Sequence, residues 1–176
     1  VSVTGSSFSN NTAGSDGGAI YIDGWTLTIA TTGYTGNAAL AGGGAVSLYG
    51  STAVVTDTVF VGNTAIAGGG IYSANSTLTI ERSTFGSNLG STSGGGVSSG
   101  GTLTITASTF SANAAGSGGA IRNGGVLHMA NSTLSGNAAT FGGGLSSGLG
   151  ALAVVTNTTI YNNTAAAITI TASITT

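Results

Sequence analysis

The stretch Leu103-Thr-Ile-Thr-Ala-Ser-Thr-Phe-Ser-Ala-Asn113 decides the fold, because it recurs along the whole chain. Seven copies, this one included, begin 24 to 26 residues apart, and no copy contains a gap. In this copy Leu103 and Ile105 alternate with Thr104 and Thr106, and a period of two indicates short β-strands. The other copies are Val1 to Asn11, Leu27 to Asn37, Ala53 to Asn63, Leu78 to Asn88, Leu127 to Asn137 and Ala153 to Asn163.

A second motif follows each block after a turn of variable length. It consists of paired glycines that lead into another apolar stretch, and in the last repeat it has degenerated to Ala165-Ala-Ala-Ile168. Its six complete copies are Gly17-Gly-Ala-Ile20, Gly43-Gly-Ala-Val46, Gly68-Gly-Gly-Ile71, Gly94-Gly-Gly-Val97, Gly118-Gly-Ala-Ile121 and Gly142-Gly-Gly-Leu145. Insertions fall in the turns, as expected when each repeat is one coil of a stack.

One such repeat cannot bury its apolar face alone, so the coils must stack. We therefore predict an all-β fold, a right-handed single-stranded parallel β-helix with about seven coils of 24–26 residues and three short strands in each coil. At ~4.8 Å a coil, the rod would be about 30 to 35 Å long. We expect residues 1–176 to be a single β-helix domain, either a mature or excised part of a longer chain or a filament subunit, with a strand-like tail over residues 167–176.

Equivalent positions of stacked coils form columns of identical or similar residues. An inward column of large side chains is predicted at Phe8, Tyr34, Phe60, Phe85, Phe110, Leu134 and Ile160. Two residues before it stands a hydroxyl column, Ser6, Thr32, Thr58, Ser83, Ser108, Ser132 and Thr158. Three residues after it stands a column of asparagines, Asn11, Asn37, Asn63, Asn88, Asn113, Asn137 and Asn163. Asparagine tolerates turn dihedrals and its amide can bond to backbone and to its neighbours, so we assign this column a structural role at the corner.

The composition excludes several classes of function. Only 3% of the residues are charged, the net charge is −2, and there is no Cys. Two arginines and no lysine cannot neutralise a phosphate backbone, so we predict no nucleic-acid partner. No apolar run reaches the ~18 residues of a membrane helix, so we predict no membrane insertion by this segment. Because 40% of the residues are hydrophobic, the chain should nevertheless fold.

The few charged residues do not form an active-site pattern. Asp57 and Arg82 occupy equivalent positions of adjacent coils beside Glu81, which an exposed ion pair explains. Asp16 and Asp23 flank the first glycine motif, but other coils carry no acid there, unlike calcium-binding solenoids. His128 replaces an outward threonine and has no acid in register, so we interpret it as a surface substitution. We therefore predict no catalytic, cofactor-binding or metal site.

Two further features concern the surface. Outward threonines such as Thr104 and Thr106 resemble the face of ice-binding solenoids, but Val54, Glu81 and His128 interrupt the array. Sugars would help to keep a rod with so few charges in solution. Sequons of the Asn-x-Ser/Thr type mark candidate glycosylation sites at Asn10, Asn75, Asn131, Asn157 and Asn162.

The two motifs together resemble the repeats of the chlamydial polymorphic outer-membrane proteins and of related bacterial surface β-helices. Phe-x-x-Asn occurs at Phe8 to Asn11, Phe60 to Asn63, Phe85 to Asn88 and Phe110 to Asn113, and Gly-Gly-Ala-Ile/Val at Gly17 to Ile20, Gly43 to Val46 and Gly118 to Ile121. The resemblance covers the whole chain and implies display at the cell surface and adhesion by an autotransported passenger.

We therefore expect a non-enzymatic extracellular or cell-surface protein that forms or decorates a fibre by self-association end to end. Bare strand edges at the ends of a solenoid recruit further strands, and a head-to-tail contact of this kind gives an open filament. The alternative is a surface adhesin, whose partners are glycans or a host or neighbouring cell surface. Sugars at the candidate sequons would make either one a glycoprotein. A polysaccharide-active enzyme is the third hypothesis, which the missing pair of carboxylates argues against.

Overall fold

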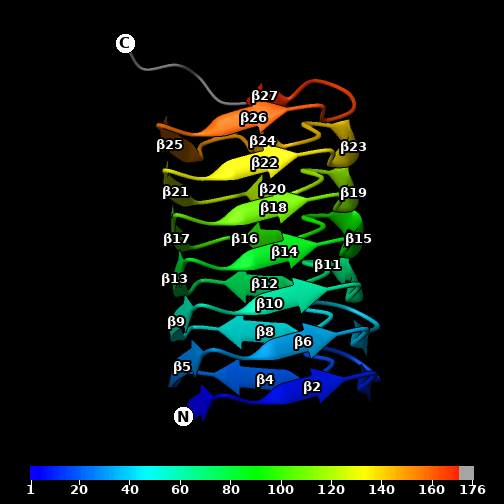
Figure 1. The fold of residues 1–176 in the computed structure, drawn as a ribbon, viewed down its shortest axis with the longest axis vertical. Coiled ribbons are helices and arrows are strands. Elements are labelled where there is room, and N and C mark those ends of the chain that lie inside the picture. Colours follow the sequence, from blue (N-terminus) through cyan, green and yellow to red (C-terminus); the bar gives the residue numbers. More distant parts are fainter. Residues whose placement is uncertain (171–176) are drawn as a thin grey trace.

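Stacked strands with alternating side chains build the whole molecule, as a computed structural model that describes residues 1–170 shows (Figure 1). Seven coils lie on top of one another, and every strand pairs in parallel with the equivalent strand of the next coil, so the predicted right-handed parallel β-helix is confirmed. The part of the predicted strand-like tail beyond Ile170 lies outside the described residues.

The first two sheets are formed by the recurring block. Sheet 1 is made of its Leu-x-Ile part and lies on one side of the rod, whereas sheet 2 carries the large inward residues. Sheet 1 contains β1 (Ser2–Thr4), β5 (Thr26–Ala30), β9 (Thr52–Thr56), β13 (Thr77–Glu81), β17 (Thr102–Thr106), β21 (Val126–Ala130) and β25 (Leu152–Thr156). Sheet 2 contains β2 (Ser7–Ser9), β6 (Gly33–Thr35), β10 (Val59–Val61), β14 (Thr84–Gly86), β18 (Thr109–Ser111), β22 (Thr133–Ser135) and β26 (Thr159–Tyr161).

Sheet 4 is formed by the apolar stretch after the paired glycines. Its inward residues stand in strict register, for example Ile71 opposite Val46 and Val97. The strands are β4 (Ile20–Asp23), β8 (Val46–Tyr49), β12 (Ile71–Ala74), β16 (Val97–Ser99), β20 (Ile121–Asn123), β24 (Leu145–Ser147) and β27 (Ile168–Ile170).

Sheet 3 corrects the prediction of three strands a coil, because the variable turn contains a fourth. Its strands are β3 (Thr12–Ala13), β7 (Ala38–Ala39), β11 (Thr64–Ala67), β15 (Leu89–Ser93), β19 (Ala114–Ser117) and β23 (Ala138–Phe141). These segments lack a clear apolar alternation. They become strands because stacking places their backbones at hydrogen-bonding distance, and the turn insertions appear as register shifts, as between Gly90 and Ser93.

The core is a narrow column between the four sheets. Parallel rings run up its centre: Tyr34, Phe60, Phe85 and Phe110 are buried, and Phe8 packs against them. Successive ring centroids are 4.5 to 5.1 Å apart and the planes are within 7° of each other. This spacing equals the distance between neighbouring strands, so the aromatic stack follows directly from coil stacking.

The paired glycines turn the chain from sheet 3 into sheet 4. Gly68 has a φ of +63°, in the left-handed region that favours glycine. Gly69 has an ordinary φ, but a Cβ there would lie 2.6 Å from the backbone of Leu89 and Gly95 in the next coil. The first glycine therefore serves the turn, and the second lets the next coil approach.

Candidate functional site

The seven asparagines predicted to hold the corner between sheets 2 and 3 lie in one continuous column. From the second coil onward, the Oδ1 of each asparagine accepts hydrogen bonds from the backbone N–H and from the Nδ2 of the asparagine in the preceding coil, at 2.8 to 3.0 Å. The remaining amide proton binds a carbonyl of sheet 2, such as that of Phe60 for Asn88. The five inner asparagines are buried, so this column holds neighbouring coils together rather than binding a ligand.

The hydroxyl column performs the same task at the preceding corner. The Ser83 Oγ donates to the Glu81 carbonyl and accepts from the Thr58 N–H at 3.2 Å, and the Ser108 Oγ repeats both contacts one coil further on. These hydroxyls are satisfied by backbone.

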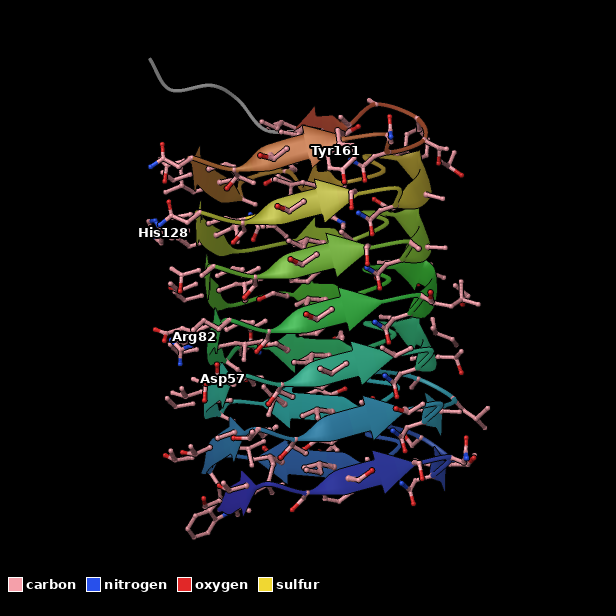
Figure 2. The ribbon with its side chains drawn as sticks, in the orientation of Figure 1. Asp57, Arg82, His128 and Tyr161 are labelled. Atoms are coloured by element: carbon pink, nitrogen blue, oxygen red, sulfur yellow. The ribbon has the colours of Figure 1, made fainter. Side chains whose placement is uncertain are left out.

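The charged cluster lies on the outside of the corner after sheet 1 (Figure 2). Arg82 makes a bidentate ion pair with Asp57, with both N–O distances 2.9 Å, and a third bond to Glu81 at 3.1 Å. The Arg82 hydrogen bonds hold the pKa of the Asp57 carboxyl below its ordinary value. Because all three side chains are about half exposed, between 40% and 55%, and bind one another, they do not converge on a substrate position.

The other isolated candidates stay apart from this cluster. His128 is exposed on β21 between Thr104 and Val154. Within residues 1–170, no three His, Cys, Asp or Glu side chains come close enough to hold a metal ion. The same residues include no helix that is long and apolar enough to cross a membrane.

The five sequon asparagines all stand at exposed corners of the rod. Each has a positive φ between 46° and 55°, as do non-asparagine residues at equivalent corners, for example Ala107 and Ala112. The left-handed backbone of these corners therefore accounts for the choice of asparagine without any sugar. Glycosylation at Asn10, Asn75, Asn131, Asn157 and Asn162 stays a prediction.

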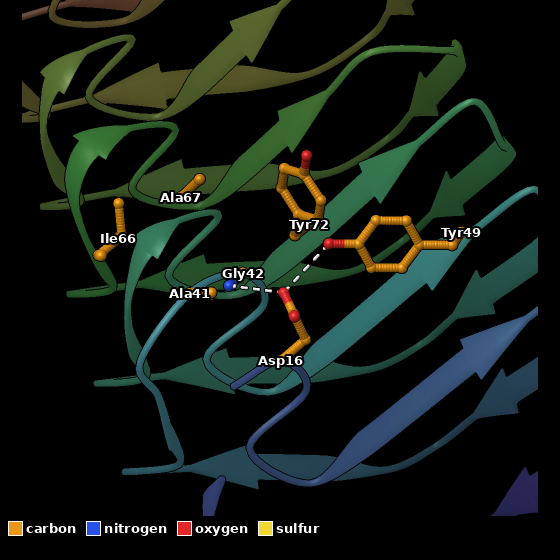
Figure 3. Close-up of a pocket in the computed structure, with 7 residues that line it drawn as sticks. All are labelled: Asp16, Ala41, Gly42, Tyr49, Ile66, Ala67 and Tyr72. Atoms are coloured by element: carbon orange, nitrogen blue, oxygen red, sulfur yellow. Dashed lines mark hydrogen bonds between the residues drawn. The ribbon is translucent and has the colours of Figure 1, made fainter. Parts of the chain in front are cut away.

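A small hollow lies outside the core, where sheet 3 turns into sheet 4 in the first three coils (Figure 3). It has a volume of about 210 Å³, and we name it the tyrosine hollow. Its lining residues are Asp16, Ala41, Gly42, Tyr49, Ile66, Ala67 and Tyr72.

Register explains why tyrosines meet at this hollow. Tyr21 and Tyr72 flank the small Ser47 in one outward column of sheet 4, and Tyr49 projects from the next outward position. The Tyr49 ring contacts both of the other rings, with centroids 5.6 Å away in each case. The rings also cover Ser47, whose hydroxyl is buried without a hydrogen-bond partner among the described residues.

Asp16 forms the polar edge of the tyrosine hollow. Its Oδ1 accepts from the Gly42 N–H at 2.9 Å and from the Tyr49 hydroxyl at 3.1 Å, and its Oδ2 accepts from the Ser15 hydroxyl at 2.8 Å. Burial and, secondly, the Asp16 carboxylate raise the pKa of Tyr49 to about 12, so this hydroxyl keeps its proton. The sequence placed Asp16 in a turn but gave no indication of this tyrosine partner, which lies 33 residues further on.

Comparison with known proteins agrees with this architecture. The family model of the right-handed β-helix region matches residues 44–175, about three quarters of the chain, and the chain belongs to this family. The model of the Chlamydia polymorphic membrane protein repeat matches residues 5–23, which include Phe8 to Asn11 and Gly17 to Ile20, so the resemblance seen in the sequence is confirmed. Neither the curated proteins nor the solved structures give a significant match.

The two family matches define the class of protein. The β-helix match gives the fold, and the match to the polymorphic membrane protein repeat suggests a surface-associated β-solenoid of the passenger type, at the outer membrane or cell surface. The matched families point to structural and surface proteins, although β-helix folds also occur in some enzymes.

Proposed function

We propose that this chain is a non-enzymatic extracellular β-solenoid that forms or decorates a cell-surface fibre by end-to-end stacking of its coils. The observation that carries the proposal is the uniform contact between coils. The same backbone ladders and asparagine bonds recur from coil to coil, and large inward side chains continue the ring stack of the first five coils, so a coil from another copy could use these contacts as well.

The first coil presents this contact surface in open form. Phe8 stacks on Tyr34 through one face of its ring, and Asn11 donates to the Asn37 Oδ1 at 2.8 Å. Among the described residues nothing donates to the Asn11 Oδ1, which in every later coil is the acceptor from the preceding asparagine. A preceding coil would therefore find both a ring face and a free acceptor.

The seventh coil is less suited to receive a coil, which makes the proposal testable at one residue. Ile168 is in register with Leu145, which puts Ala166 at the position of the second glycine. At that position in inner coils, such as Gly69, a Cβ would come too close to the backbone of the next coil. Stacking on the seventh coil thus requires a local shift at this corner, and Ala166→Gly should remove the need for it.

Electron microscopy of the purified chain over a range of concentrations tests end-to-end assembly. Filaments with an axial repeat of about 34 Å, seven coils at ~4.8 Å, would support the proposal, and Ala166→Gly should lower the concentration at which they form. Ala139→Gly, a change of the same size in the sheet 3 strand of the sixth coil, is the control. Single short rods of both the parent chain and Ala166→Gly at every concentration would refute assembly.

Adhesion is the second candidate, and exposed aromatic residues near the first coil favour it. Trp25 is 72% exposed and Tyr21 is 50% exposed. Because both residue types are enriched in binding sites, their exposure here favours a binding surface. We would assign an adhesin instead of a fibre if monomeric rods bound saturably to cells and if Trp25→Ala, but not Tyr161→Ala on β26, reduced this binding. Absence of such binding would remove this candidate.

A further inference from the structure

The tyrosine hollow combines a negative charge with aromatic faces. Both ion pairs among residues 1–170 belong to Arg82, so the Asp16 carboxylate has no cationic partner there. Tyr49 and Tyr72 meet at 56°, which makes two walls of a corner rather than one flat platform. Carboxylates and tyrosine faces both attract cations, and the combination is typical of aromatic cages.

The hydrogen bonds that Asp16 already accepts limit which kind of cation the tyrosine hollow can bind. Its two oxygens already accept three bonds, from Gly42, Tyr49 and Ser15, out of about four that a carboxylate can take. The Tyr49 hydroxyl donates its hydrogen bond to the same carboxylate. The hollow therefore offers charge and ring faces but few directed hydrogen bonds, which suits a cation that has no N–H groups.

The size of the hollow agrees with this chemistry. A volume of about 210 Å³ corresponds to about seven water molecules at ~30 Å³ each. A trimethylammonium group with its adjoining methylene is smaller than this, so the hollow can accommodate it. Ala41, Ile66 and Ala67 supply apolar contacts for methyl groups on the side opposite Tyr49 (Figure 3).

We propose that the tyrosine hollow, formed by Asp16, Tyr49 and Tyr72, binds a quaternary ammonium group such as the headgroup of choline. Asp16 supplies the counter-charge, the two rings supply cation–π contacts, and Gly42, which has no Cβ, lets the Asp16 carboxylate and the Tyr72 ring approach its backbone closely. The bearer is either free choline or a choline lipid, which share this headgroup. The proposal does not depend on end-to-end stacking.

Titration of the whole chain with tetramethylammonium and with choline chloride, followed by the NMR signals of the tyrosine rings, tests the proposal. We expect saturable shifts at Tyr49 and Tyr72. Tyr72→Leu and Asp16→Asn should each weaken binding about fivefold or more, the loss of one face or charge. Gly42→Ala should abolish it, because the new Cβ would lie 2.8 Å from the Asp16 Oδ1 and from the Tyr72 ring.

Matched controls separate binding from folding. Tyr161→Leu on β26 and Asp57→Asn at the corner after sheet 1 change an exposed tyrosine and an exposed acid away from the tyrosine hollow, and both should leave the affinity unchanged. Circular dichroism checks that each variant is folded. If Gly42→Ala does not fold, Tyr72→Leu still tests the proposal. Flotation with phosphatidylcholine vesicles would assign a choline lipid, and binding of choline without flotation a free ligand.

Three results would overturn the proposal. They are the absence of saturable shifts up to 100 mM choline, an equal response to glucose, and binding that survives both Tyr72→Leu and Asp16→Asn in folded protein.

Discussion

Removal of one asparagine from the middle of the column should destabilise the rod more than any surface change in the same coil. Asn88→Ala deletes four side-chain hydrogen bonds, of which two come from Asn63, one goes to the Phe60 carbonyl and one to Asn113. The Asn63 backbone N–H and one of its amide protons then lose their acceptor. Asn63 is fully buried, so bulk water does not reach these donors.

The magnitude follows from these two orphaned donors. Each buried group without a partner costs ~1–3 kcal/mol, so we expect Asn88→Ala to lower the free energy of unfolding by about 2 to 6 kcal/mol. That is a large part of the ~5–15 kcal/mol that stabilises an ordinary domain. The matched change Thr84→Ala, at an exposed position of the same coil, should stay within ~0.5 kcal/mol.

Urea unfolding followed by far-ultraviolet circular dichroism measures both variants. Tyrosine fluorescence provides a second probe, because a solenoid can unfold in parts and the two transitions need not coincide. If Asn88→Ala lowered the free energy of unfolding by less than 1 kcal/mol, or no more than Thr84→Ala, the column would not carry the contact between coils.

Three other predictions concern a hydroxyl, a corner and an ion pair. Tyr34→Phe should raise the free energy of unfolding by about 1 kcal/mol in the same urea assay, because the Tyr34 hydroxyl is buried without a partner among the described residues; a loss of stability would contradict this. Gly69→Ala should lower the free energy of unfolding by about 3 kcal/mol, since its Cβ would press on the next coil. Gly50 has open space around it, so Gly50→Ala should cost only the ~1–2 kcal/mol of its left-handed backbone. Equal losses would show that close approach is not the cause. Arg82→Gln should return the Asp57 titration midpoint, measured by NMR, toward its ordinary 3.8, because Arg82 lowers it; the stabilisation by this pair is present above the ordinary pKa and is lost as pH falls through the lowered one, so an unchanged midpoint would refute the coupling.

The number of strands in a coil could be predicted only in part from the sequence. The periods of the block and of the glycine motif predicted three strands a coil, and all three were found, in sheets 1, 2 and 4. Sheet 3 was missed because Thr64–Ala67 and its equivalents have no apolar alternation to reveal them. Their hydrogen-bond partners lie one coil away, so the pairing depends on stacking and not on the local sequence.

The candidate site was less predictable than the fold. Asp16 was recognised as a turn residue, but Tyr49 and Tyr72 belong to the second and third coils and are not at equivalent positions of their repeats. An ordered repeat reveals columns, whereas the tyrosine hollow is a departure from the columns. Its residues could be combined only once the corner between sheets 3 and 4 was built in space.

The sequence by itself determined the coil, its length and the order of stacking, because a repeat with one apolar face has no stable alternative to stacking on itself. It also determined which residues share a column, since the interval between Phe and Asn never changes. The tertiary structure alone decided the fourth strand of each coil, which lies in sheet 3, the pairing of Asp16 with Tyr49 and the shape of the hollow. These features depend on side chains and backbones from different coils, whose distances are set by the turns, and the turns vary in length from one coil to the next.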